Sequence, residues 1–162
     1  MSTQRRWRLV VGSDDAGMAY KDLIVADLRN DPRVSEVVDL GVSADEHTPY
    51  PDIGLTAAER VAAGEADRAV LVCGTGIGMA VSANKVPGVR ATTAHDSYSA
   101  ERSVLSNDCQ VLAEGQRVIG AELARRLVGE WLGYEFDPSS ASNDKVARIT
   151  SYEQTGSRAD AT

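Results

Sequence analysis

The sequence predicts one α/β domain, in which a doubly wound, five-stranded parallel sheet is sandwiched between two layers of helices. Three observations lead to this fold class. Short apolar runs alternate with longer segments of helical periodicity five times along the chain, which is the pattern of repeated strand–helix units. Several of these runs are continuously apolar, as is typical of parallel strands covered on both faces. The length of 162 residues suits a single domain with a sizeable core.

The five predicted strands are apolar runs that end at glycine or at polar residues. In chain order they are Trp7–Val11, Glu36–Leu40, Ala69–Cys73, Val89–Thr93 and Gln110–Ala113. The third has the clearest signal, because its apolar residues pass directly into a segment with three closely spaced glycines. Right-handed crossovers between parallel strands then place helices on both faces of the sheet.

A helix is predicted after each strand. The five helices are Met18–Arg29, Ile53–Ala63, Met79–Lys85, Ser97–Leu105 and Ala121–Tyr134. In the last of these, an apolar stripe of Leu123, Leu127, Trp131 and Leu132 predicts the face that packs on the core. A sixth helix, Asp144–Glu153, follows a polar connector, and little of the chain remains to cover it. We therefore expect it to pack on a second subunit.

Composition narrows the class of protein. Apolar residues make up 43% and charged residues 25%, as in ordinary globular domains. The net charge of −7 argues against a nucleic-acid partner, and the short N-terminal apolar run fits neither a signal peptide nor a membrane segment. Two cysteines provide no disulfide framework, which favours the cytoplasm. We expect one domain over residues 1–153 and a disordered tail over residues 154–162.

In a doubly wound sheet of this Rossmann-like kind, ligands bind outside the carboxyl ends of the strands. Four segments of the sequence fall at that edge. They are Gly12-Ser13-Asp14-Asp15, Cys73-Gly74-Thr75, His95-Asp96 and Gly115-Gln116-Arg117. The sequence therefore predicts that these segments form one rim, which we treat as the candidate site.

The glycine-rich loop of residues 74–78 follows the third strand and precedes a helix. Glycines allow backbone N–H groups to converge on one point, and such a cluster binds an oxyanion or a phosphate. The spacing of Gly74, Gly76 and Gly78 does not match the dinucleotide fingerprint, and no Gly-Lys-Ser/Thr follows. A tight strand–helix junction with no ligand is an equally good interpretation of the loop alone.

Cys73 stands directly before this loop. Many cysteines are small buried apolar residues, and Cys109 is interpreted in that way. At the carboxyl end of a central strand, the N–H groups beside Cys73 would instead stabilise negative charge on its sulfur. A base next to an anion-binding loop suits proton abstraction beside a carbonyl group.

The other polar residues of the rim allow two interpretations each. Asp14 and Asp15 either bind substrate hydroxyls or start a helix, and Arg117 is a phosphate ligand or a surface charge. His95 is a candidate proton donor, and His47 lies in a polar loop where we expect it to be solvated. Two separated histidines make a metal site improbable.

The chain resembles the type B ribose-5-phosphate isomerases and their galactose-6-phosphate isomerase relatives over about residues 8–153. The resemblance is carried by Gly12-Ser13-Asp14, Tyr50-Pro51, Cys73 to Gly78, Ala83-Asn84-Lys85, Tyr98-Ser99-Ala100, Ser106-Asn107-Asp108 and Gly115 to Gly120. It implies an aldose–ketose isomerase that needs no cofactor or metal and acts on a small phosphorylated sugar. It also implies a homodimer with shared active sites, or a higher homo-oligomer.

The resemblance also implies a role for each residue of the site. Cys73 is the base that moves a proton between the two reacting carbons, and Thr75 lies near the carbonyl end of the substrate. Other residues hold the substrate: the backbone of Gly74, Gly76, Ile77 and Gly78 binds the enediolate, Asp14, Tyr50 and Asn107 bind hydroxyls, and Arg117 binds phosphate. Asp15 and Lys145 occupy positions that contact phosphate in the family.

Departures from the family pattern point to a particular substrate. Asp15 replaces a histidine, Ala141 and Lys145 align with two phosphate-binding arginines, and Ser106 replaces the histidine that opens a furanose ring. A four-carbon sugar phosphorylated on its last oxygen cannot close a furanose, so it needs no such histidine. The residues around His95–Asn107 resemble the D-erythrulose-4-phosphate isomerase branch, which acts in tetritol catabolism. The alternatives are a ribose-5-phosphate isomerase of the pentose phosphate pathway and a non-catalytic sugar-phosphate sensor.

Overall fold

The computed structural model describes residues 5–158 and contains a five-stranded parallel sheet. The strands are β1 (Trp7–Ser13), β2 (Val34–Asp39), β3 (Arg68–Cys73), β4 (Ala91–Thr93) and β5 (Val111–Gly115), in the order β2-β1-β3-β5-β4. The helices are α1 (Met18–Arg29), α2 (Tyr50–Ala62), α3 (Ile77–Ala83), α4 (Ser97–Leu105), α5 (Ala121–Trp131) and α6 (Asn143–Thr155), with a short 3₁₀ helix η1 (Asp15–Gly17). The predicted fold class is confirmed.

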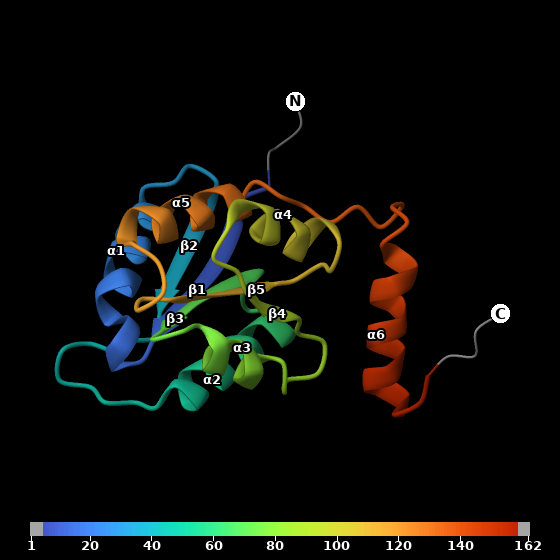
Figure 1. Cartoon of the computed structure of the whole chain (residues 1–162), viewed down its shortest axis with the longest axis horizontal. Helices are drawn as coiled ribbons and strands as arrows, with labels where there is room; N and C mark the ends of the chain where they lie inside the picture. Colours follow the sequence, from blue (N-terminus) through green and yellow to red (C-terminus); the bar gives the residue numbers. More distant parts are fainter. Residues whose placement is uncertain (1–4, 159–162) are drawn as a thin grey trace.

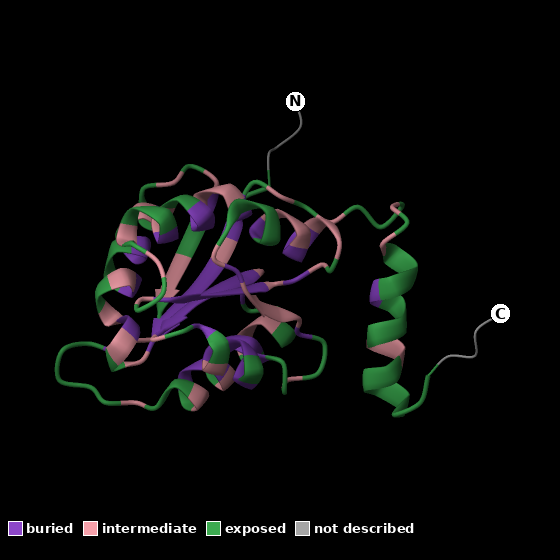
Figure 2. Ribbon diagram, in the orientation of Figure 1, coloured by how far each residue is buried: buried purple, intermediate pink, exposed green. Residues whose placement is uncertain are grey.

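Helices cover both faces of the sheet (Figure 1). α1, α4 and α5 lie on one face, and α2 and α3 lie on the other. Alternate residues of β3 point to opposite faces: Val70 and Val72 join the first apolar cluster, whereas Leu71 and Cys73 join the second. Figure 2 shows that buried residues concentrate in the central strands between the two helical layers.

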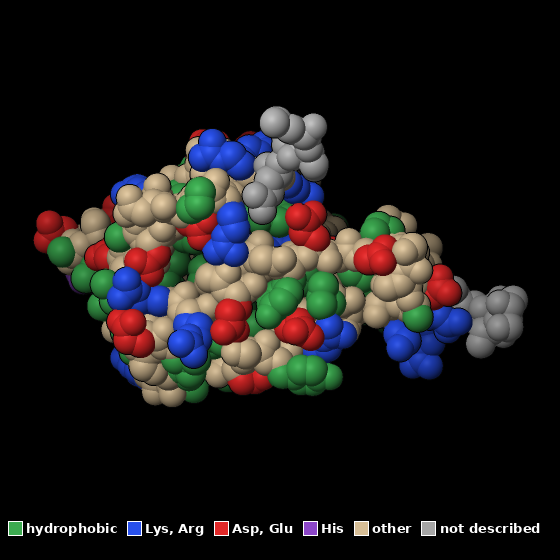
Figure 3. Space-filling model, turned by 90° about the horizontal axis from the view of Figure 1, so that it is seen from above, with side chains coloured by type: hydrophobic (Ala, Val, Ile, Leu, Met, Phe, Trp, Pro, Cys, Tyr) green, Lys and Arg blue, Asp and Glu red, His purple; other side chains and the backbone are tan. Residues whose placement is uncertain are grey.

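α6 differs from the other helices because it stands to one side of the sandwich (Figure 1). Val146 is its only buried residue, while Ile149 and Tyr152 are more than half exposed. One hydrogen bond joins it to the body, from the Gly88 N–H group to the Glu153 carboxylate at 2.8 Å. Viewed from above, α6 forms a protrusion, and acidic and basic side chains are interspersed over the rest of that face (Figure 3).

Two predicted elements differ from the observed ones for local reasons. The predicted strand Val89–Thr93 pairs only from Ala91, because Gly88 has a φ of +85° and Val89 closes a turn by donating to the Val86 carbonyl. α2 begins at Tyr50 instead of Ile53, since Pro51 is compatible with the first helical turn. The other boundaries agree with the prediction within about three residues.

Two predictions near the C-terminus also need correction. Leu123 was expected to face the core, but it is 39% exposed, and Ala124 and Val128 are buried in the stripe instead. α6 extends to Thr155, two residues into the predicted tail, and ends at Gly156 with a φ of +68°. The end of that tail, residues 159–162, lies outside the described residues.

The strand order places a topological switch point beside β3. The chain passes from β1 to β2 on one side of β1 and then to β3 on the other side. The loops that follow the adjacent strands β1 and β3 therefore lead away in opposite directions. A crevice for ligands is therefore expected at the carboxyl ends of these two strands. Across residues 5–158, no helix has the length and apolar character that crossing a membrane requires.

Candidate active site

The four predicted rim segments meet at the carboxyl edge of the sheet. The loop after β5 is bonded to the loop after β3, through Gln116 N–H to the Cys73 carbonyl at 2.9 Å and Arg117 N–H to the Gly74 carbonyl at 3.0 Å. Gly115 N–H donates to His95 Nε2 at 2.8 Å. Gly17, which follows Asp14-Asp15, lies against the backbone of residues 72–73 so closely that no Cβ would fit. The prediction of one rim is confirmed.

Cys73 lies at the centre of this rim, at the end of β3. Its side chain is 4% exposed and points to the face covered by α2 and α3. The sulfur accepts a hydrogen bond from the Gly76 N–H group at 3.1 Å. The sulfur is thus buried among apolar residues and still in contact with the glycine loop, which is the contact that a basic sulfur requires.

The loop itself needs glycine at two positions. Gly76 has a φ of +77°, and a Cβ there would come within 3.0 Å of the Glu114 backbone and of Thr93. At Gly78, a Cβ would collide with the ring of Tyr50, which covers the start of α3. Two N–H groups of the loop already have partners inside it, since Gly76 donates to Cys73 and Ile77 donates to Thr75 Oγ1 at 3.3 Å.

The two aspartates after β1 have separate environments. Asp14 caps η1, because its Oδ1 accepts from the Gly17 N–H group at 3.2 Å. Asp15 is exposed and lies 2.9 Å from Nδ1 of His47, which belongs to the loop between β2 and α2. His47 is exposed to solvent as expected, and its pairing with a residue of the rim was not predicted.

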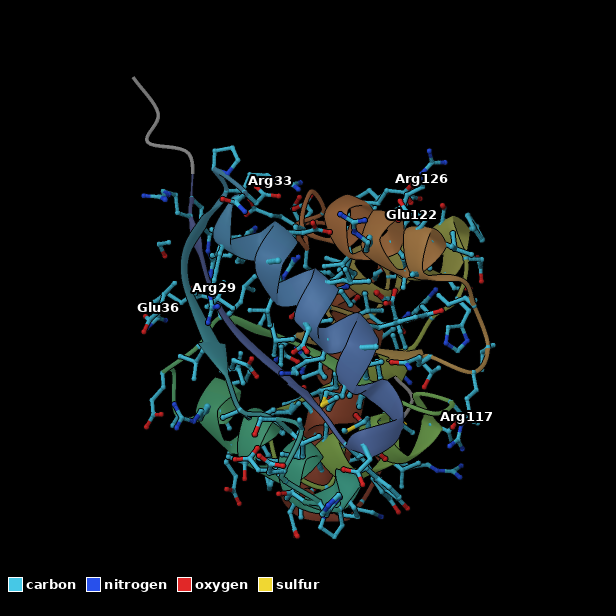
Figure 4. The ribbon with its side chains drawn as sticks, turned by 90° about the vertical axis from the view of Figure 1, so that its left-hand side faces the viewer. Arg29, Arg33, Glu36, Arg117, Glu122 and Arg126 are labelled. Atoms are coloured by element: carbon cyan, nitrogen blue, oxygen red, sulfur yellow. The ribbon has the colours of Figure 1, made fainter. Side chains whose placement is uncertain are left out.

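Arg117 extends over Gly74. Its Nη1 and Cδ atoms lie 3.4 Å from the position that a Cβ of Gly74 would occupy. Figure 4 shows Arg117 at the end of the molecule where α1 begins, whereas Arg33 lies where α1 ends. Its exposed guanidinium group is thus at the mouth of the glycine loop, where an anionic substrate could reach it.

His95 joins the rim in a form that limits its chemistry. Because Nε2 accepts the Gly115 N–H group, that nitrogen carries no proton. Burial lowers the pKa of His95, against a smaller opposing effect of Asp96, and so favours the neutral ring. The predicted proton donor therefore has only its Nδ1–H group to offer while this hydrogen bond persists.

Asn107 and Lys145 are not brought to Cys73 within one chain. Asn107 follows α4 and precedes β5, so it lies at the amino end of the sheet, and β5 separates it from the rim by roughly 15 Å. It lines a hollow of about 490 Å³ together with Arg90, Arg102 and Ile149 of α6. Lys145 is an exposed residue of α6. One chain by itself therefore does not bring these two residues to Cys73, and their place in a site shared between two copies stays a prediction.

The sequence reasoning missed Glu114, which lies in β5 beside Val72. Its side chain is fully buried, and neither carboxylate oxygen has a hydrogen-bond partner among residues 5–158. Burial raises its pKa to about 8. The available signal was an acidic residue directly after the predicted strand Gln110–Ala113, which the observed strand includes. No group of three His, Cys, Asp or Glu side chains within the described residues is arranged to hold a metal ion.

Comparison with known proteins assigns the chain that carries this rim to a family. The family model described as Ribose/Galactose Isomerase matches residues 9–149. The chain belongs to the ribose/galactose isomerase family. Its relatives include D-erythrulose-4-phosphate isomerase 2 of Mycolicibacterium smegmatis, which is 58% identical over 90% of this chain and 97% of its own. Ribose-5-phosphate isomerase B of Escherichia coli is 41% identical over 91% of this chain and 97% of its own.

A solved structure agrees with this assignment. Ribose-5-phosphate isomerase B of Clostridium thermocellum superimposes with a TM-score of 0.86 at 41% identity, over 93% of this chain and 99% of that one. The resemblance inferred from the motifs is thus confirmed for the family and the fold. As a member of the ribose/galactose isomerase family, the protein is a sugar-phosphate isomerase.

Proposed function

We propose that the protein interconverts D-erythrulose 4-phosphate and D-erythrose 4-phosphate through a cis-enediolate, in the cytoplasm and as part of tetritol catabolism. The observation that supports the chemistry most directly is the Cys73 sulfur held against the glycine loop by the Gly76 N–H group. Two observations favour the tetrose substrate. Ser106 stands where ring opening would require a histidine, and the relative at 58% identity is named for this substrate.

In the proposed reaction, Cys73 removes a proton from C1 of the ketose, and the C1–H electron pair forms the enediolate double bond while the C2 carbonyl becomes an oxyanion. The remaining loop amides of Gly74, Thr75 and Gly78 stabilise this charge. The hydroxyl proton on O1 passes to the O2 oxyanion, Cys73 then returns its proton to C2, and the C1–O bond becomes the aldehyde carbonyl. Asp14 and Tyr50 orient the hydroxyls, and Arg117 binds the phosphate. The number of atoms and electrons is unchanged, so the reaction requires no cofactor.

We further propose that the active site is completed by a second copy of the chain. Asn107 lines a hollow together with Ile149 of α6, and Lys145 belongs to α6 itself, so both lie on the side of the molecule that carries this helix. Exposed apolar residues are available for contact between copies: Ile77 and Val81, one turn apart on α3, are 60% and 55% exposed, and Ile149 and Tyr152 project from α6. A two-fold dimer could therefore place Asn107 of one copy near Cys73 of the other.

Substrate profiling tests the reaction. The purified enzyme is assayed with D-erythrulose 4-phosphate and with ribose 5-phosphate, and exchange of solvent deuterium into the carbon beside the carbonyl is followed in parallel. We expect turnover and exchange with the tetrose phosphate to exceed those with the pentose phosphate. Efficient turnover of ribose 5-phosphate alone would establish the alternative, a ribose-5-phosphate isomerase that opens the ring with another group. Binding without exchange would indicate a sensor.

Subunit mixing tests the shared site. The variants Cys73→Ala and Asn107→Ala are each expected to be nearly inactive. After random exchange of subunits, half of the dimers are mixed, and each has one site with both native residues, so about a quarter of the wild-type activity should return. No recovery in dimers shown to be mixed would mean that Cys73 and Asn107 do not serve one site across the interface.

A further inference from the structure

We propose that His47, oriented by Asp15, binds the substrate phosphate together with Arg117. The inference rests on the proposed function, because it assigns the phosphate contact of the same site. The sequence raises the question of how phosphate is held. Asp15 is a carboxylate at the rim where an anionic group is proposed to bind, and Ala141 and Lys145 stand where the resemblance implies two phosphate-binding arginines.

The geometry places Arg117 beside Gly74 and connects His47 to the neighbouring segment through Asp15. On one side, Arg117 Nη1 is 3.4 Å from the position of a Gly74 Cβ. On the other side, the Cβ of Ala16 is 3.7 Å from that same position. Asp15 is the neighbour of Ala16 in the chain and pairs with His47 at 2.9 Å. Arg117 thus contacts Gly74 directly, and the pairing of Asp15 with His47 joins the imidazole to the segment that packs on the same glycine.

The hydrogen bond fixes the orientation of the imidazole. An ionised carboxylate can only accept hydrogen bonds, so the proton between Asp15 and His47 belongs to Nδ1. Nε2 then points away from Asp15, and in the imidazolium form it carries a second N–H group that can donate to a phosphate oxygen. The His47 and Asp15 side chains are 76% and 60% exposed, so a ligand can reach the pair.

The charge of the pair matters as much as its geometry. Asp15 alone would repel a phosphate dianion, and this repulsion is only partly screened at the short distances of a binding site. A proton on the His47 imidazole that arrives with the phosphate would cancel that charge and add a donor. Other basic side chains are engaged elsewhere: Lys21 is buried against Asp39, and Arg90 is paired with Asp108 at the opposite end of the sheet.

The test compares His47→Gln with Asp45→Asn, a control on the same exposed loop. For each variant, KM and kcat for the tetrose phosphate are measured, together with the inhibition constants of inorganic phosphate and of erythritol, an uncharged analogue. For His47→Gln we expect the KM and the phosphate inhibition constant to rise about 10-fold, because a charge-assisted donor is lost. We expect kcat and the erythritol constant to change by less than about twofold. Asp45→Asn should behave like the wild type.

Asp15→Asn supplies a second readout. This change removes the repulsion, so adding His47→Gln to it should raise the phosphate inhibition constant by less than His47→Gln does in the native background. A role limited to loop structure would weaken phosphate and erythritol binding alike and would overturn the inference. An unchanged phosphate constant in His47→Gln would overturn it as well. If the wild type isomerises neither sugar phosphate, the proposed function fails, and phosphate binding measured by calorimetry still decides the role of His47.

Discussion

The two cysteines of this chain are equally buried and differently placed. Cys73 is 4% exposed at the carboxyl end of β3, where its sulfur accepts the Gly76 N–H group at 3.1 Å. Cys109 is 7% exposed just before β5, at the opposite end of the sheet. Burial raises the pKa of Cys109 to about 11, and the neighbouring charges of Arg90 and Asp108 oppose one another there.

The comparison shows that the position of a thiol in the fold matters more than its burial. At Cys109 burial disfavours the thiolate, and no hydrogen-bond donor among residues 5–158 compensates for this. The neutral thiol therefore behaves as a small apolar group. At Cys73 the chain turns sharply through a left-handed glycine and directs a backbone N–H group at the sulfur. The carboxyl ends of the strands provide such loops, which is why the reactive sulfur is expected there.

Removing each thiol in turn gives the largest expected effect. Cys73→Ala should lower kcat by at least ~100-fold and by as much as ~10⁴-fold, the range for loss of a general base. Cys109→Ala, the matched control, should leave kcat within about twofold and cost only about 1 kcal/mol of stability. Steady-state kinetics and urea unfolding of both variants measure these changes. Near-native turnover by Cys73→Ala would show that the base has been misassigned.

Glu114 sharpens the comparison, because it is a second buried acid without a hydrogen-bond donor. Its pKa is raised from an ordinary 4.5 to about 8 by burial. Between these two values the unfolded chain loses the proton while the folded chain keeps it, so this residue makes the fold less stable as pH rises from about 4.5 to about 8. Below that window the contribution of Glu114 to stability is small, and above it the penalty is complete, at roughly 5 kcal/mol.

Glu114→Gln removes this titration and tests the prediction. The free energy of unfolding of the wild type minus that of the variant should fall by roughly 3–4 kcal/mol between pH 5 and pH 8.5. Urea titrations of both proteins at several pH values measure it, and the other titrating groups cancel in the difference. A difference that does not vary with pH would mean that Glu114 has hydrogen-bond partners in solution, which would make it unlike Cys109.

Patterns within one segment allowed most of the fold to be predicted from the sequence. The run from Ala69 to Gly78 contains a buried strand, a turn that needs glycine and the start of a helix, so strand, loop and thiol could be placed together. The rim followed from topology, since parallel strands end at one edge. Local patterns do not encode pairs between distant segments, such as Asp15 with His47, and that pair was missed.

The same limit applies to Asn107. The motif identified the residue as part of the site, but only the chain path shows that α4 returns to the amino end of the sheet before β5 begins. A residue can therefore belong to an active site and still lie far from its partners in one copy of the chain. Glu114 was missed because a carboxyl group directly after an apolar run resembles the end of a strand, and its burial depends on the helices packed above it.

The smallest of the expected effects concerns the donor that distinguishes Cys73 from Cys109. Gly76→Ala and Gly88→Ala both place an alanine at a left-handed position, with φ of +77° and +85°. Each should lose about 1–2 kcal/mol of stability for that backbone strain.

The two positions differ in the space around the added atom. At Gly88 a Cβ meets nothing within 4 Å, whereas at Gly76 it would press on the Glu114 backbone at 3.0 Å and displace the N–H group from the sulfur. Only Gly76→Ala should lose activity, by ~10- to 100-fold, the cost of one donor to a charged group. If the two variants have equal activity and equal stability, the Gly76 N–H group contributes nothing to the chemistry of Cys73, and the contrast between the two cysteines must have another cause.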